Sequence, residues 1–132
     1  MTDSKVLLDT SAWLAFFDAK DDKQIFTLML GNTIIYTSVL TLFEMRRKFL
    51  KGGIEEDAAL KFLEAVREHS ILAEITDTIA LSGAEYAAKK RLASVDSLIY
   101  ATAMQHACTL ITFDNDFRGL QNVKVLKLED KK

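Results

Sequence analysis

Proline is absent from this chain of 132 residues, and cysteine and histidine are scarce. The single cysteine, Cys108, excludes an internal disulfide and favours a reducing compartment, so we expect a cytoplasmic protein. With two histidines beside that cysteine, the chain has too few nitrogen and sulfur ligands for a structural zinc site. A metal bound by this chain would therefore be a hard cation held by oxygen ligands.

Long apolar runs are missing as well. The longest uncharged stretch, between Asp96 and Asp114, falls short of the roughly 20 apolar residues that a membrane span needs, and Gln105 and His106 interrupt it. The beginning of the chain shows no signal peptide, because only a few apolar residues precede Asp9. These absences predict a protein that is not held in a membrane.

An excess of positive charge is also lacking. The formal net charge is −2, which argues against binding a polyanion through a globally basic surface. Two local basic clusters remain, at 46–51 and 89–91. Apolar residues make up 49% of the chain, enough for the core of one domain. We expect a single domain over residues 1–128 and a charged tail over 129–132.

Short apolar segments alternate with helical patterns along the chain. We predict strands and helices in turn, with strands at about 5–9, 34–37, 71–74, 109–112 and 123–128, and helices at about 11–18, 21–30, 39–50, 54–68, 76–91 and 95–107. Ser38 and Ser94 are the expected caps of two of these helices. The alternation predicts an α/β fold, a three-layer α/β/α sandwich with a central parallel sheet of four to five strands.

Four acidic residues are predicted at the carboxyl edge of this sheet, where such folds bind ligands. Asp9 ends the first strand, and Glu44 lies in the helix after the second strand. Asp96 lies in the first turn of the buried helix at 95–107, and Asp114 follows the fourth strand. Two carboxylates about 5 Å apart repel by roughly 3 kcal/mol at an effective dielectric near 20. Mg²⁺ or Mn²⁺ would compensate that repulsion and would suit phosphodiester hydrolysis.

Each acid also has an ordinary interpretation when taken alone. Asp9 would cap a helix, Asp96 would be a favourable charge at a helix N-terminus, and Asp114 would be a turn residue. Glu44 would form an i,i+4 surface pair with Lys48. The joint placement of four acids, and not any single one, favours a catalytic site.

Hydroxyl and basic residues complete the candidate site. Ser11 and Thr112 are expected to orient an acid or a bound water, although each would equally cap its own turn. Arg47, Lys48 and Lys51 share a helix face with the second acid by spacing and would hold phosphates there. A solvated helix face explains these three basic residues equally well.

The motifs LLDTSAW, SVLTLFEM, SVDSLIYATA and LITFDNDF follow one another over about 6–128. Together they resemble the PIN-domain family, close to the VapC-type toxin ribonucleases. The resemblance implies a PIN-like sandwich and an Mg²⁺- or Mn²⁺-dependent ribonuclease whose four acidic positions are matched here. Asp9 and Asp96 match the usual direct metal ligands, Asp116 matches a further and less uniform acid, and Thr112 matches a hydroxyl residue often found in the last motif.

The resemblance also implies partners and leaves alternatives. VapC-type proteins usually pair with an antitoxin that blocks the active site, and many form homodimers, so an antitoxin, a homodimer and an RNA substrate are expected. PIN domains also occur in RNA-processing nucleases that are not toxins. A phosphoacceptor receiver domain that uses Asp9 is disfavoured because no acid follows the middle strand, and a binding module with vestigial acids stays open.

Overall fold

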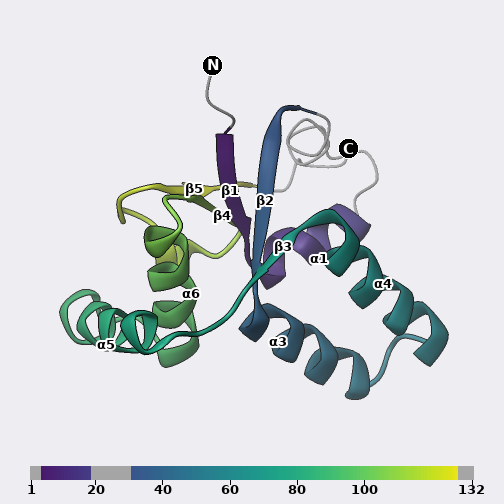
Figure 1. Ribbon diagram of the computed structural model, residues 1–132. Helices are drawn as coiled ribbons and strands as arrows, with labels where there is room; N and C mark the ends of the chain where they lie inside the picture. The colour runs from purple at the N-terminus through teal and green to yellow at the C-terminus, as the bar shows by residue number, and fades with distance from the viewer. Residues whose placement is uncertain (1–3, 19–30, 128–132) are drawn as a thin grey trace.

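The computed structural model describes residues 4–18 and 31–127, and the helix predicted at 21–30 lies outside them. Five strands form one parallel sheet in the order β3-β2-β1-β4-β5 (Figure 1). The elements in chain order are β1 (Ser4–Leu8), α1 (Thr10–Asp18), β2 (Thr33–Ser38), α3 (Val39–Leu50), α4 (Glu56–His69), β3 (Ile71–Ala73), α5 (Asp77–Lys90), α6 (Ser94–Gln105), β4 (Thr109–Thr112), η1 (Asn115–Phe117) and β5 (Val123–Val125). The predicted α/β class and central parallel sheet are confirmed.

Strand β1 lies in the middle of the sheet, paired with β2 on one side and β4 on the other. Side chains alternate between the two faces of a strand. Val6 and Leu8 therefore enter a core shared with α1, α3 and α4, and Leu7 enters a second core shared with α6. This arrangement of two cores explains why β1 is apolar without interruption, and it produces the three-layer sandwich.

Helix α5 packs closely on α6 at Gly83. A Cβ atom added there would lie 2.9 Å from Leu98 Cδ2, so the close approach of α6 accounts for a glycine inside a helix. Six residues of α6 are buried, because α6 is covered by α5 on one side and by the sheet on the other. Within residues 4–18 and 31–127, no helix is both long enough and apolar enough to cross a membrane.

Helix boundaries follow the capping predictions in one case and not in another. Ser38 caps α3 as predicted, with its Oγ accepting the Leu40 N–H at 3.1 Å. The prediction for Ser94 is wrong, because Ala93 occupies the cap position and Ser94 is the first residue of α6. Helix α4 begins at Glu56 and not at 54, since Glu55 has an extended backbone and occupies the cap position.

The sheet order places a topological switch point between β1 and β4. From β1 the chain builds β2 and β3 on one side, and then crosses to build β4 and β5 on the other. Ligands of open parallel sheets bind beyond the carboxyl ends of the strands at such a point. Asp9 and Asp114 follow the two flanking strands. The order also differs from the 2-1-3-4-5 order of flavodoxin-like sheets, to which receiver domains belong, so the receiver hypothesis is wrong.

Candidate metal centre and active site

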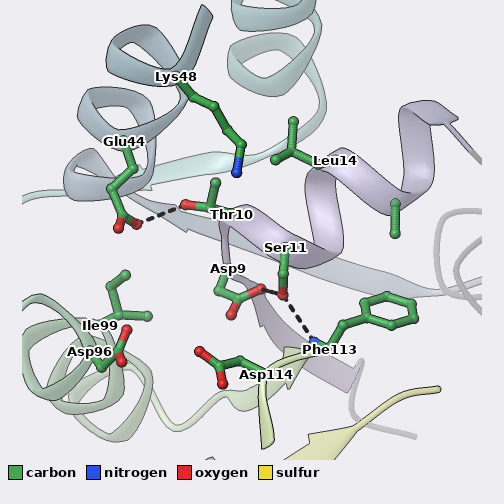
Figure 2. A pocket seen from close by; sticks show the side chains of 11 residues that line it. Asp9, Thr10, Ser11, Leu14, Glu44, Lys48, Asp96, Ile99, Phe113 and Asp114 are labelled. Carbon is green, nitrogen blue, oxygen red and sulfur yellow. Dashed lines mark hydrogen bonds between the residues drawn. The ribbon is translucent and has the colours of Figure 1, made fainter. Parts of the chain in front are cut away.

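A pocket of about 500 Å³ opens at this switch point. The structure brings all four predicted acids to it, from the ends of β1 and β4 and from helices α3 and α6 (Figure 2). Its apolar walls are formed by side chains of α1, α6 and the segment after β4, namely Leu14, Ala15, Ile99 and Phe113. Acids that are far apart in the sequence therefore share one cavity.

Asp9 is the most buried of these acids, with 6% of its surface exposed. Its Oδ1 accepts hydrogen bonds from Ser11 Oγ at 2.7 Å and from the Ala12 N–H at 2.9 Å. Its Oδ2 accepts a short hydrogen bond from Thr112 Oγ1. The Ala12 bond caps α1, so the ordinary interpretation of Asp9 as a helix cap also holds.

Two backbone amides fix the direction of both hydroxyl groups around Asp9. Phe113 N–H donates to Ser11 Oγ at 2.9 Å, and Asp114 N–H donates to Thr112 Oγ1 at 3.0 Å. Because each hydroxyl oxygen accepts from an amide, its proton is turned toward the carboxylate. Three of the roughly four lone-pair positions of the carboxylate are then occupied, which leaves one on Oδ2 for a ligand.

Burial and hydrogen bonding oppose each other at Asp9. Burial is the largest influence and raises the pKa of Asp9 above its ordinary value, and repulsion from Asp114 adds to this rise. The hydrogen bonds from Thr112, Ser11 and the Ala12 amide favour the ionised form and offset part of the rise. The site is thus built to keep a buried carboxylate in one orientation.

Glu44 is held from the opposite helix by a residue that we did not predict. Thr10 Oγ1 donates to Glu44 Oε1 at 2.8 Å, and both side chains line the pocket. The threonine lies next to the first acid in the sequence, but 34 positions separate it from its partner, so no local pattern signals the contact. The expected pair with Lys48 is absent from the salt bridges of the described residues, which makes that interpretation of Glu44 wrong.

Two acids of the pocket, Asp96 and Asp114, form a group with Asp116, which is exposed and lies outside the pocket lining. Asp96, Asp114 and Asp116 each offer an oxygen within 4.8 Å of the other two. Burial raises the pKa of Asp96 to about 6, and repulsion from the other acids, Asp114 first, adds to the rise. Asp114 Oδ1 also accepts the Asp116 N–H at 2.9 Å, which is the turn chemistry expected of it. Local structure and a shared cavity are therefore served by the same side chains.

The predicted basic residues separate into two groups. Lys48 lines the pocket, and its side chain extends from α3 toward Thr10 and Leu14 (Figure 2). Arg47 and Lys51 are exposed and do not belong to the residues that line it. A role in holding phosphates is thus supported by position for one of the three.

The donor set fits a hard divalent cation. Apart from the Lys48 ammonium, the polar side-chain atoms that line the pocket are carboxylate and hydroxyl oxygens, which are the ligands that Mg²⁺ and Mn²⁺ prefer. The pKa of Asp96 is raised by burial first and by repulsion from the neighbouring acids second, and a bound cation would relieve that repulsion. Asp9 would ligate through Oδ2, since its other oxygen is fully engaged.

Solved structures of similar fold include several toxin–antitoxin complexes. A chain of the complex from Klebsiella pneumoniae has a TM-score of 0.75 at 22% identity, and the match covers 93% of this chain and 99% of that one. A chain of VapBC2 from Rickettsia felis, bound to a fragment of promoter DNA, has a TM-score of 0.78 at 17% identity, covering 93% and 98%. A chain of VapBC-5 from Mycobacterium tuberculosis has a TM-score of 0.67 at 25% identity, and the match covers 95% of this chain and 99% of that one.

Sequence comparison gives a family as well as a fold. No curated protein sequence matches this chain significantly. The family model described as PIN domain, however, matches residues 6–122, a range that contains all four acids of the pocket. The match spans most of the chain, and the chain therefore belongs to the PIN-domain family.

Proposed function

We propose that this protein is a metal-dependent endoribonuclease that hydrolyses RNA phosphodiester bonds and acts as the toxin of a VapBC-type toxin–antitoxin pair. The observation that carries the proposal is the single pocket lined by Asp9, Glu44, Asp96 and Asp114 at the switch point of the sheet. Membership of the PIN-domain family supports nuclease chemistry at such a site.

The acidic side chains of the pocket would have two roles, holding the cation and orienting the attacking water. Asp9 and Asp96 would hold Mg²⁺ or Mn²⁺, with Asp114 and Asp116 beside them. The bound cation supplies charge that polarises the phosphodiester and stabilises the leaving oxygen. Thr10 donates to Oε1 of Glu44 and fixes the direction of this carboxylate, which would orient the attacking water.

Ser11, Thr112 and Lys48 support this chemistry without taking part in bond cleavage. The two hydroxyl groups hold Asp9 in its ligating orientation. The Lys48 ammonium lies at the rim of the pocket, where it would neutralise a phosphate of the bound RNA. Arg47, exposed on α3, and Lys51, the exposed residue at the C-terminal cap of α3, would contact phosphates outside the pocket.

An antitoxin partner and a homodimer belong to the same proposal. The similar structures from Klebsiella pneumoniae, Rickettsia felis and Mycobacterium tuberculosis are toxin–antitoxin systems. We expect a small neighbouring reading frame that encodes a DNA-binding antitoxin, and a cytoplasmic complex of the two proteins. Light scattering of the purified protein would measure the oligomeric state. The absence of such a reading frame would favour an RNA-processing nuclease instead.

Cleavage of single-stranded RNA with Mg²⁺ or Mn²⁺ tests the nuclease proposal. We expect activity in the wild type, loss of activity with EDTA, and loss in Asp9→Asn and in Asp96→Asn. Asp77→Asn is the matched control, because Asp77 also lies in the first turn of a helix but is exposed on α5, outside the pocket. Full activity in either pocket variant, or equal cleavage in EDTA, would refute the proposal.

A further inference from the structure

A second pocket lies beside the acidic one, and we propose that it binds one unpaired nucleobase of the RNA whose phosphate occupies the acidic pocket. This inference rests on the ribonuclease proposal and adds a substrate subsite to it. The second pocket has a volume of about 240 Å³ and lies between α1, α3, α4 and the turn that joins α3 to α4.

The two pockets are adjacent. Leu14 of α1 and Lys48 of α3 line both of them, so these two side chains form the border between the acids and the second pocket. In Figure 2 the Lys48 side chain extends from α3 toward Leu14 of α1. A nucleotide that is bound by its phosphate at the acids would therefore place its base between these elements.

The walls of the second pocket are mainly apolar and include three phenylalanines. Phe17, Phe49 and Phe62 line it, with ring centroids 4.5 Å apart for Phe17 and Phe62 and 5.8 Å apart for Phe49 and Phe62. All three side chains are only partly buried, so the cluster keeps accessible ring surface. Partly exposed aromatic rings are the surfaces on which proteins stack the bases of single-stranded RNA.

The turn between α3 and α4 keeps the mouth of the second pocket open. Gly52 and Gly53 have φ angles of +118° and +92°, a region that residues with side chains avoid. Among the described residues, no heavy atom lies within 4 Å of a Cβ atom built at either glycine, so residues 4–18 and 31–127 do not crowd the turn. The same two glycines therefore shape the turn and leave room for a planar ligand.

Charge at the border suits a nucleotide better than an apolar protein segment. Lys48 is exposed, and it forms no salt bridge among residues 4–18 and 31–127. Its ammonium would neutralise the phosphate that joins the stacked base to the next nucleotide. The volume of about 240 Å³ lies below the roughly 300–1,000 Å³ of pockets that enclose drug-sized ligands, which suits one base and not the face of a helix.

RNA binding without cleavage tests the subsite. Fluorescence anisotropy would compare a short single-stranded RNA of random sequence with an abasic ribose-phosphate chain of equal length, using the full chain with Glu44→Gln and Mg²⁺, because Glu44 is proposed to orient the water and not to hold the ion. Gel analysis would verify that the RNA stays intact. We expect Phe49→Leu to weaken RNA binding roughly five- to ten-fold, through loss of a stacking surface, and to leave abasic binding unchanged. Phe43→Leu is the control, because Phe43 is 61% exposed on the same helix but lines neither pocket.

Lys48→Gln gives a second and independent measurement. It should weaken binding of the RNA and of the abasic chain equally and lower the salt dependence of binding by about one phosphate contact, whereas Arg47→Gln should change binding less.

Equal RNA affinity of wild type and Phe49→Leu would overturn the subsite, as would an equal loss of affinity for the abasic chain. Loss of antitoxin binding in Phe49→Leu with unchanged RNA binding would also overturn it and assign the pocket to the protein partner. The binding measurement does not depend on cleavage. If the wild type binds RNA through its bases but does not cleave it, the nuclease proposal is refuted and the base subsite stands.

Discussion

Asp96→Asn should stabilise the protein when no metal is bound. The pKa of this carboxyl rises from 3.8 to about 6 in the folded protein, which would correspond to roughly 3 kcal/mol for a fully buried group. Asp96 is only half-buried, so solvent screening reduces the penalty to about 1.5 kcal/mol. Losing a negative charge in the first turn of α6 subtracts about 0.5 kcal/mol. The expected net gain in the free energy of unfolding is about 1 kcal/mol.

The gain should depend on pH in a defined direction. A carboxyl whose pKa is raised by folding destabilises the folded state when it is ionised. The penalty is therefore absent below about pH 4, grows as the pH rises toward 6, and is complete above that value. Asp96→Asn should stabilise the protein near neutral pH and lose this advantage near pH 4.

Urea denaturation in EDTA, followed by circular dichroism at both pH values, measures this difference. The control is Asp77→Asn, an exposed charge in the first turn of α5; it should lower stability by about 0.3–1 kcal/mol. Saturating Mn²⁺, at about a hundred times its dissociation constant, should stabilise the wild type by about 2.7 kcal/mol and stabilise Asp96→Asn much less. If Asp96→Asn instead behaves like Asp77→Asn near neutral pH, Asp96 is only a helix-terminus charge and the reasoning fails.

Three further changes test how the pocket is built. Asp9→Asn should keep the circular dichroism spectrum of the wild type but lose Mn²⁺ binding in isothermal titration calorimetry; an unfolded variant would show that Asp9 serves mainly as the cap of α1. Thr10→Val should lower the cleavage rate about five-fold, the equivalent of one hydrogen bond of about 1 kcal/mol to Glu44, and Thr10→Ser should restore it, so equal rates in all three proteins would contradict a positioning role. Thr112→Val should lower the free energy of unfolding by about 1–3 kcal/mol, because it removes a donor from a buried carboxylate oxygen; unchanged stability in urea would show that this oxygen is satisfied in another way.

Several features of the chain could be predicted because they depend on neighbouring residues. The apolar run Val6–Leu8 before Asp9 predicts a buried strand, and the segment 95–107, apolar on almost every side, predicts the buried helix α6. Parallel strands present their carboxyl ends at one edge, so acids that follow different strands are expected to meet there. The fold class and the shared location of Asp9 and Asp114 therefore required only local periodicity and one topological rule.

The ends of the elements were less predictable than their existence. The helix expected at 54–68 begins at Glu56, and the strand expected at 123–128 ends at Val125. Propensity alone did not distinguish Ala93 from Ser94 as the cap of α6. Such boundaries depend on turn geometry and on contacts outside the element, which residue type alone does not encode.

By itself, then, the sequence determined the alternation of strands and helices and the identity of four acids at one edge of the sheet. Only the tertiary structure decided how these acids are held. It joined Thr10 to Glu44, turned Ser11 and Thr112 toward Asp9, and placed a second, mainly apolar pocket beside the first. It also decided the raised pKa of Asp96, which results from burial among charges on other elements. The physical reason is that hydrogen bonds and Coulomb interactions depend on distances in space, whereas the patterns of a sequence record only distances along the chain.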